Sequence, residues 1–383
     1  MEGIHSQPAM SDPDMHLDGP VFILSNMREY GGAEKSIATL VPYLAGATQV
    51  HIFTENQRHH DDLARIESPN LTLTRTAKGN SPAAILRTFW IILRAYLQER
   101  PTVLLANGHK GAMFMAMLRL LLPGMRARCA VYIRDFDYYW LHHFLKPMPD
   151  ALLLAPSQSI FEHPRYRKWG IERWDCQVVE NAVEPGRDAD SVAQPESFVG
   201  CCARLLPWKG VEYLIRAFRL VVDAVPEAKL RVHGEPIDEA YVAKLHALVS
   251  ELRLGESVAL HDFTPKIADV YRAGAFFVVP SLNQIPGPES FSRIVIESWS
   301  HRRPVIAFAV GGPRYLIDEG VDGFLVEEKN VGQLAERIVT LLGDPGRRDE
   351  MGRRGFEKVR TRFNPSDLAG SLLKTLYAKG RSA

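Results

Sequence analysis

Short apolar runs alternate with stretches of helical periodicity along this chain, and the alternation limits the folds that it can adopt. Five strands are expected in the first half, at Val21–Leu24, His51–Thr54, Val103–Ala106, Ala130–Ile133 and Leu152–Ala155. Helices are expected between them, because apolar residues recur at intervals of three and four near 37–44, 83–98 and 111–122. Strands alternating with helices favour βαβ units in a parallel sheet, so the predicted fold class is α/β.

The pattern restarts after residues 183–197, a polar segment with two prolines and no apolar period, which is typical of a linker. Six further strands are expected, at Phe198–Ala203, Lys229–His233, Val258–His261, Phe276–Pro280, Val305–Ala309 and Phe324–Val326. The helices expected between and after them lie near 209–224, 238–252, 267–273, 290–301, 313–318 and 331–342.

These boundaries predict a two-domain chain. We expect a disordered tail over 1–18, a first domain over 19–182, the linker over 183–197, a second domain over 198–364, and a helix over 365–383 that can cross back to the first domain. Two α/β domains of similar size joined by a linker create a cleft, the usual place for a ligand.

Charge and cysteine content narrow the class of protein. Across 383 residues, 46 basic side chains nearly balance 45 acidic ones, which argues against a nucleic-acid-coating protein. No apolar run approaches the roughly 20 residues of a membrane span, and residues 1–18 lack the basic and apolar regions of a signal peptide. The four cysteines form no Cys-x-x-Cys motif, so reduced thiols in a cytoplasmic protein are expected.

Two cations lie where the first strand of the second domain is expected to end. Arg204 ends that strand, and Lys209-Gly210 opens the helix that follows. A lysine at a helix N-terminus is unfavourable unless an anion lies nearby, because the helix dipole is positive there. Cations at the carboxyl end of a parallel strand could hold a phosphate. Taken alone, the pair fits a phosphate clamp and two solvated side chains equally well.

Two glutamates lie eight positions apart around a later helix start. Glu289 follows a loop rich in proline and glycine, and the first helical turn leaves amide donors free at Phe291–Arg293. Glu297 lies in an apolar helix, where an unpaired carboxylate is costly. Ribose hydroxyls or a neighbouring arginine would both satisfy it.

Taken in order, these motifs resemble the retaining nucleotide-sugar glycosyltransferases of the GT-B architecture, specifically glycosyltransferase family 4. The residues that carry the resemblance are Gly31-Gly32-Ala33-Glu34, Arg204, Lys209-Gly210, Glu289, Glu297, Gly311-Gly312-Pro313 and Asp322–Val326. Alone, Gly31-Gly32 is only a turn signal and not the G-x-G-x-x-G fingerprint. The resemblance is dense over 198–360 and thinner over 19–182.

The resemblance implies two Rossmann-like domains facing a central cleft, and transfer of a sugar from a nucleoside-diphosphate sugar, UDP-sugar favoured. The acceptor would be a glycan or lipid-linked molecule, in cell-surface polysaccharide synthesis. No cofactor is implied, because the nucleotide sugar is a substrate. The implied donor-binding residues are Gly31, Gly32, Arg204, Lys209, Gly234, Ser292, Arg293, Ile294 and Glu297. Glu289 would contact the transferred sugar.

The first domain departs from the family pattern. Arg134-Asp135 stands where many members have histidine followed by aspartate near the sugar, so the resemblance implies that Arg134 and Asp135, together with Glu289, are the catalytic residues. His109, after the strand Val103–Ala106, would touch the acceptor or lie in a surface loop. Asp135-Phe136-Asp137 fits a metal-binding Asp-x-Asp pattern of another glycosyltransferase fold, but the two-domain layout favours a site without metal.

The second domain has departures of its own. Family members usually have glycine at the positions of Ser292 and Arg302, and glutamate at that of Tyr315. Two other functions stay open for the chain as a whole. One is a nucleotide-sugar epimerase of the same fold, and the other is a binding module without catalysis.

The first domain also concentrates positive charge. Residues 81–134 hold eight basic side chains and one acidic one, Glu99, around an apolar run at 113–122. A buried helix with solvated flanks explains this, and so does peripheral contact with an anionic membrane leaflet on its inner, cytoplasmic face.

Overall fold

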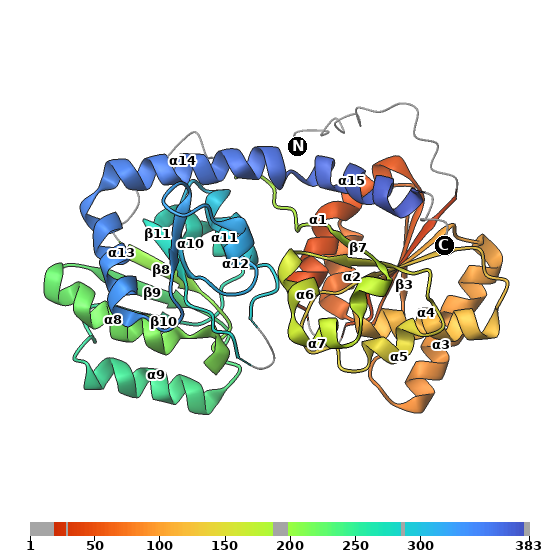
Figure 1. Cartoon of the computed structure of the whole chain (residues 1–383), viewed down its shortest axis with the longest axis horizontal. Helices are drawn as coiled ribbons and strands as arrows, with labels where there is room; N and C mark the ends of the chain where they lie inside the picture. Colours follow the sequence, from red (N-terminus) through yellow and green to blue (C-terminus); the bar gives the residue numbers. More distant parts are fainter. Residues whose placement is uncertain (1–18, 28–29, 187–197, 285–287, 379–383) are drawn as a thin grey trace. The chain divides into compact units, whose positions relative to one another are not determined.

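The computed structural model describes residues 19–27, 30–186, 198–284, 288–378 of the chain. These residues belong to two compact units, each described here by itself (Figure 1). Unit 1 comprises Met1–Ala182 together with Pro365–Ala383, and unit 2 comprises Val183–Asn364. The expected tail over 1–18 and most of the expected linker lie outside the described residues.

Within the described residues, unit 1 forms a seven-stranded parallel sheet in the order β3-β2-β1-β4-β5-β6-β7. Its strands are β1 (Val21–Leu24), β2 (Val50–Thr54), β3 (Leu71–Arg75), β4 (Val103–Asn107), β5 (Arg128–Tyr132), β6 (Leu152–Ala155) and β7 (Asp175–Val178). The five expected strands are confirmed to within two residues at either end. β3 and β7 were not expected, because they form the two edges of the sheet and are only half buried, so neither has an apolar run.

Helices cover both faces of the unit 1 sheet. They are α1 (Gly32–Ala47), α2 (Gln57–Ala64), α3 (Pro82–Glu99), α4 (His109–Leu121), α5 (Leu141–Leu145), α6 (Gln158–Glu162), α7 (Pro164–Lys168) and α15 (Pro365–Tyr377), with a 3₁₀ turn η1 (Ile171–Arg173). On one face, Ile37 of α1 and Leu372 of α15 share a core with Ile23 of β1. On the other face of the sheet, Phe89 of α3 and Phe114 of α4 belong to a second hydrophobic core. The C-terminal α15 therefore lies beside α1 (Figure 1).

Within the described residues, unit 2 forms a six-stranded parallel sheet in the order β10-β9-β8-β11-β12-β13. Its strands are β8 (Phe198–Cys202), β9 (Lys229–His233), β10 (Val258–His261), β11 (Phe276–Val279), β12 (Val305–Phe308) and β13 (Gly323–Val326). Its helices are α8 (Val211–Ala224), α9 (Glu239–Glu251), α10 (Ile267–Ala273), α11 (Arg293–Trp299), α12 (Pro313–Leu316), α13 (Val331–Gly343) and α14 (Pro345–Arg362), with a 3₁₀ turn η2 (Pro207–Lys209). All six expected strands are confirmed, whereas the highly charged α14 was not expected.

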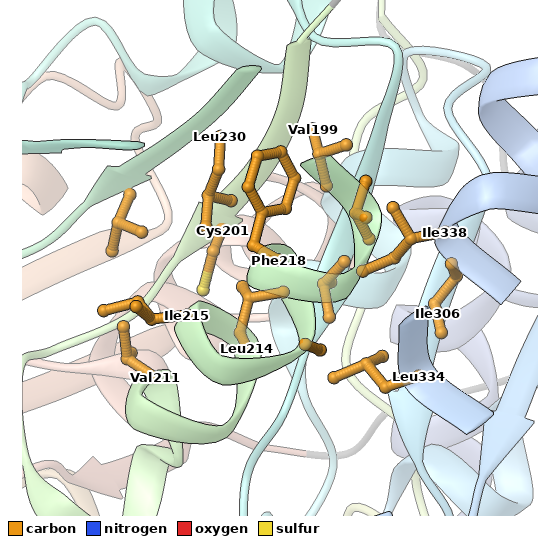
Figure 2. Packing of buried hydrophobic residues seen from close by; sticks show 14 of the residues in the cluster. Val199, Cys201, Val211, Leu214, Ile215, Phe218, Leu230, Ile306, Leu334 and Ile338 are labelled. Carbon is orange, nitrogen blue, oxygen red and sulfur yellow. The ribbon is translucent and has the colours of Figure 1, made fainter. Parts of the chain in front are cut away.

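The core of unit 2 explains why the apolar periodicity of the sequence predicted its helices and strands. Leu214 and Phe218 of α8 are fully buried against the side chains of Val199 and Leu230 on the sheet (Figure 2). Ile338 of α13 completes the same layer. Residues spaced by three or four on a helix and by two on a strand meet in one apolar layer, which is the signal carried by the sequence.

Strand order creates a switch point in each sheet. In unit 1, β1 lies between β2 and β4, and in unit 2, β8 lies between β9 and β11. The chain passes to one side of β8 through α8 and then returns to its other side with β11. In open parallel sheets, ligands bind beyond the carboxyl ends of the strands at such a point.

None of the helices in the described part of the chain combines the length and apolar composition that a membrane span requires. All four cysteines are free thiols. Burial raises the pKa of the Cys129 and Cys201 thiols to about 12, so both stay protonated near neutral pH.

Candidate functional site

The loop after β8 carries the two expected cations. Arg204 follows the strand by two residues and is exposed. Lys209 is buried, with 8% of its surface exposed, and it ends the 3₁₀ turn η2. The expectation that Lys209 opens a helix is wrong: α8 begins at Val211, after Gly210 turns the chain with a φ of +65°.

Lys209 reaches across the switch point to the loop after β11. Its Nζ forms an ion pair with Oε1 of Glu289. The hydroxyl of Ser281 donates to the same carboxylate oxygen at 3.0 Å, and the Trp208 ring lies 4.0 Å from the lysine Nζ. Because both side chains are nearly buried, the ammonium and the carboxylate hold each other in place, and two residues 80 positions apart become one charged unit.

The helix after Glu289 begins later than expected. α11 starts at Arg293, so Phe291 and Ser292 precede it, and the free amides of its first turn begin at Arg293 and Ile294. Ser292 has a φ of +76°, in the left-handed region that favours glycine. Arg302 shares this property with a φ of +56°. These are the two positions where family members usually have glycine, and the backbone supplies the reason.

Arg293 and Tyr271 of unit 2 both bind the Glu297 carboxylate. The Nε of Arg293, one turn earlier on α11, donates to its Oε1 at 3.1 Å, and the hydroxyl of Tyr271 donates to its Oε2 at 3.2 Å. Burial raises the pKa of Tyr271 well above its ordinary value, so the phenol keeps its proton and acts as a donor. The arginine that the sequence left open as a partner is therefore Arg293. Each carboxylate oxygen can still accept further hydrogen bonds.

Glycines let the loops of unit 2 approach one another at the carboxyl edge of the sheet. A Cβ on Gly234, just after β9, would lie 1.8 Å from the carbonyl oxygen of Ala203. A Cβ on Gly312, in the turn after β12, would lie 2.4–2.6 Å from the backbone of Phe291. The positions therefore exclude a side chain, and the backbone atoms around Arg204 and Ser292 are packed tightly.

In unit 1, the paired glycines lie at the start of α1. Gly32 is the first residue of the helix, and Gly31 caps it in an extended conformation. The Gly31 amide donates to Oε2 of Glu34 at 2.9 Å, so this side chain satisfies one of the amides at the helix N-terminus. The loop after β1 therefore corresponds to the loop after β8, because each follows the strand at the switch point of its sheet and leads into a helix.

Arg134, two residues after β5, lies in a buried polar network near the carboxyl edge of the unit 1 sheet. Its Nε donates to Asn107 Oδ1 at 2.8 Å, and its Nη1 donates to Asn181 Oδ1 at 2.8 Å and to Ser36 Oγ at 3.2 Å. The guanidinium also stacks on the Tyr132 ring at 3.2 Å. Through these contacts Arg134 connects α1, β4, β5 and the segment after β7, and the hydrogen bonds offset part of the cost of burying its charge. The sequence offered no sign of these partners.

The other expected unit 1 residues lie close to this network in the chain. Asp135 accepts a hydrogen bond from the Phe136 amide at 2.7 Å. His109 opens α4, one residue after Asn107-Gly108, and its ring lies 4.8 Å from that of Tyr138. Desolvation lowers the pKa of His109, so its ring is neutral at pH 7.

A buried ion pair beside His109 was not expected. Lys110 donates to Glu55 Oε2 at 2.7 Å and to the Gly79 carbonyl at 2.9 Å. Both charged side chains are nearly buried. The pair joins the residue after β2 to the first turn of α4, and nothing in the sequence indicated that these two charges would meet.

Among the described residues, no group of three or more His, Cys, Asp or Glu side chains is placed to hold a metal ion. Asp135 and Asp137 stand on either side of Phe136, which is fully buried.

Comparison with known proteins identifies unit 2. Residues 187–358 match the family model described as Glycosyl transferases group 1. The second unit carries a glycosyl transferases group 1 domain. The resemblance to glycosyltransferase family 4 that the motifs indicated is confirmed. The match lies entirely within unit 2, where the motifs are densest.

Curated relatives of this chain align with it over part of their length. D-inositol 3-phosphate glycosyltransferase of Corynebacterium glutamicum (strain R) is 31% identical over 187 residues, covering 48% of this chain and 44% of that protein. Poly(ribitol-phosphate) alpha-N-acetylglucosaminyltransferase of Staphylococcus aureus (strain COL) is 27% identical, covering 46% and 34%. The chain thus spans about half or less of the length of these two relatives.

Solved structures match nearly the whole chain. Anabaena HepE in complex with UDP aligns with a TM-score of 0.77 and 19% identity, covering 94% of this chain and 100% of HepE. At this identity the likeness shows the fold, and it confirms the expected GT-B architecture of two parallel α/β sheets.

The close approach at Gly210 generates a stability prediction. A Cβ there would lie 2.0 Å from the Pro280 carbonyl oxygen, and the φ of +65° strains any other residue. We expect Gly210→Ala to destabilise the protein by about 2–4 kcal/mol in urea unfolding. Gly255→Ala is the matched control, because nothing lies within 4 Å of its Cβ position, and it should change stability by less than about 0.5 kcal/mol. Equal stability of the two variants would contradict the packing of the two loops.

Proposed function

We propose that this protein is a retaining glycosyltransferase that moves a sugar from a UDP-sugar to a hydroxyl of a glycan or lipid-linked acceptor. The observation that carries the proposal is the pairing of Lys209 with Glu289 across the switch point of a glycosyl transferases group 1 domain. UDP is favoured because HepE, of the same fold, was solved with UDP and with UDP-glucose.

The loop after β8 would stabilise the leaving diphosphate. Negative charge grows on the diphosphate as the bond to the sugar breaks, and fixed cations lower the energy of that state. Arg204 and Lys209 supply two cations, and the amides of Ser292, Arg293 and Ile294 add donors. An ammonium has three N–H groups, so Lys209 can keep its bond to Glu289 while it reaches the diphosphate.

Unit 2 would also hold the rest of the donor. Glu297 is oriented by Arg293 and Tyr271, and it would accept hydrogen bonds from the two ribose hydroxyls. Glu289 would contact hydroxyls of the transferred sugar. Gly234 would leave backbone groups open to the base.

In unit 1, Gly31 and Gly32 would let the backbone approach the donor, and Asp135 and Arg134 would serve the sugar site. His109, neutral at pH 7, would accept or donate a hydrogen bond at an acceptor hydroxyl. The relatives' names include D-inositol 3-phosphate and poly(ribitol-phosphate), and this supports an acceptor rich in hydroxyl groups. We place the activity in the cytoplasm, at the inner face of the membrane, in polysaccharide synthesis.

The proposed phosphate clamp, formed by Arg204 and Lys209, can be tested with binding measurements. We expect Arg204→Ala and Lys209→Met each to weaken UDP binding about 10- to 100-fold in isothermal titration, because each removes a charge-assisted hydrogen bond. Lys209→Met leaves Glu289 unpaired, so Lys209→Met/Glu289→Gln, compared with Glu289→Gln, isolates the contribution of the cation. Arg216→Ala, an exposed arginine on α8, is the matched control. Unchanged UDP affinity in both clamp variants would exclude this site.

Substitutions of Glu297 and Glu289 should have different effects on UDP binding and on sugar transfer. We expect Glu297→Gln to weaken binding of UDP, because its ribose contacts lose charge assistance. Glu289→Gln should preserve or strengthen binding of UDP, since Lys209 loses its internal partner, while it lowers transfer of the sugar. Titration with UDP and a turnover assay with UDP-sugar measure both. An equal loss of UDP affinity in both variants would contradict these roles.

Transfer should persist in a chelator, because Arg204, Lys209 and backbone amides supply the positive charge that a metal would otherwise bring. The measurement is product analysis with labelled UDP-sugar, with and without EDTA. Retained anomeric configuration in the acceptor product is the expected result. Inversion within the donor would indicate an epimerase, binding without turnover would indicate a binding module, and rescue of activity by manganese would restore the Asp135–Asp137 metal hypothesis.

A further inference from the structure

Helix α3 of unit 1 presents an apolar line to solvent. Its buried side is anchored by Phe89 and Ile92 in the core. Leu86, Trp90 and Leu97 are instead 53%, 63% and 55% exposed. At about 100° per residue, these three side chains fall within about 40° of one another around the helix axis. They therefore form one continuous stripe.

A basic line runs beside this stripe. Arg87 and Arg94 are exposed on α3, seven residues apart, and so they share one side of the helix next to the apolar line. Arg100, just after α3, is also exposed. None of these three arginines forms an ion pair with a described residue.

The end of α4 adds the same two kinds of side chain. Leu120 and Leu121 are 71% and 53% exposed, and the nearby Arg126 is exposed. Arg126 precedes β5 by two residues and Arg100 precedes β4 by three. Because β4 and β5 are paired neighbours, both arginines lie at the amino-terminal edge of the sheet. We define the α3–α4 surface as Leu86, Trp90, Leu97, Leu120 and Leu121 with Arg87, Arg94, Arg100 and Arg126.

The other four basic residues of 81–134 are used inside unit 1. Arg119 pairs with Asp150, and Arg128 pairs with Asp175 and reaches carbonyls at the end of α15. Lys110 and Arg134 lie in the buried networks described above. The one acid of the stretch, Glu99, is paired with His51. The eight basic side chains thus fall into four with partners inside unit 1 and four exposed ones on or just after the neighbouring helices α3 and α4.

We propose that the α3–α4 surface docks on the anionic leaflet of a lipid membrane. The proposal rests on the proposed function and deepens it by placing the enzyme where a lipid-linked acceptor would be. Tryptophan and leucine side chains insert at the headgroup level, and arginines beside them pair with lipid phosphates. Four cations without acidic partners would repel the same surface on a second copy of the chain, so a lipid surface is the better fit.

The geometry also suits catalysis at a membrane. α3 follows β3, so its first turn lies at the carboxyl edge of the sheet, the edge where Gly31 and His109 are found. Docking along α3 would leave this edge beside the lipid, within reach of a headgroup that carries the acceptor.

The test is sedimentation of the full chain with vesicles of phosphatidylcholine and phosphatidylglycerol, and with vesicles of phosphatidylcholine alone. We expect binding to the anionic vesicles only, released by salt. Arg87→Ser/Arg94→Ser/Arg126→Ser should weaken it on the order of a hundredfold, since each cation near the surface contributes about a factor of five to ten. The matched control is Arg353→Ser/Arg354→Ser/Arg360→Ser, which removes the same charge from exposed positions on α14.

A second variant locates the contact. Quenching of tryptophan fluorescence by brominated phosphatidylglycerol should fall in Trp90→Phe, whereas this variant still sediments. UDP binding, measured in parallel, should be unchanged in every variant, so loss of docking and loss of the donor site are distinguishable. Binding to neutral and anionic vesicles alike, binding to neither, equal weakening by the α14 control, or undiminished quenching in Trp90→Phe would each overturn the proposal.

Discussion

The ion pair between Lys209 and Glu289 joins the two loops on which the candidate donor site depends. The loop after β8 brings the cation and the loop after β11 brings the carboxylate, and they meet because β8 and β11 are neighbours in the sheet. Gly210 allows the approach, since any Cβ there would strike the Pro280 carbonyl. A buried ion pair contributes little net stability, because desolvation offsets attraction. The pair holds the Lys209 ammonium at a fixed position between the two loops.

Unit 1 also holds a buried cation, Arg134, and neutral side-chain oxygens are among its partners. Arg134 is buried, and the side-chain oxygens of Ser36, Asn107 and Asn181 accept hydrogen bonds from its guanidinium. An arginine held this way keeps its positive charge close to the carboxyl edge of the sheet. Both units therefore place an immobilised cation near their switch points, where an anionic ligand would be attracted.

Much of the fold was predictable, and the exceptions have physical reasons. The strand Val21–Leu24 was predicted to the residue because a strand buried on both faces is a continuous apolar run. The edge strand Leu71–Arg75 was not predicted, because threonines separate its two leucines and it contains no continuous apolar run. The helix Pro345–Arg362 was not predicted from the sequence. Most of its residues are charged or polar, and its apolar face, which includes Met351 and Val359, is too short to give a clear helical period. α11 begins three residues later than expected, because Ser292 adopts a left-handed conformation that sequence alone does not reveal.

The sequence by itself determined the α/β class, the positions of the buried strands along the chain and the motifs that mark a glycosyl transferases group 1 domain. These properties are local, since apolar periodicity and residue type act over a few neighbouring positions. Only the tertiary structure decided which charges are paired and which are exposed. Lys209 meets Glu289 across 80 residues, and Arg119 is paired with Asp150 whereas Arg126 faces solvent. Such pairings depend on which strands become neighbours, and no local pattern in the chain encodes that choice.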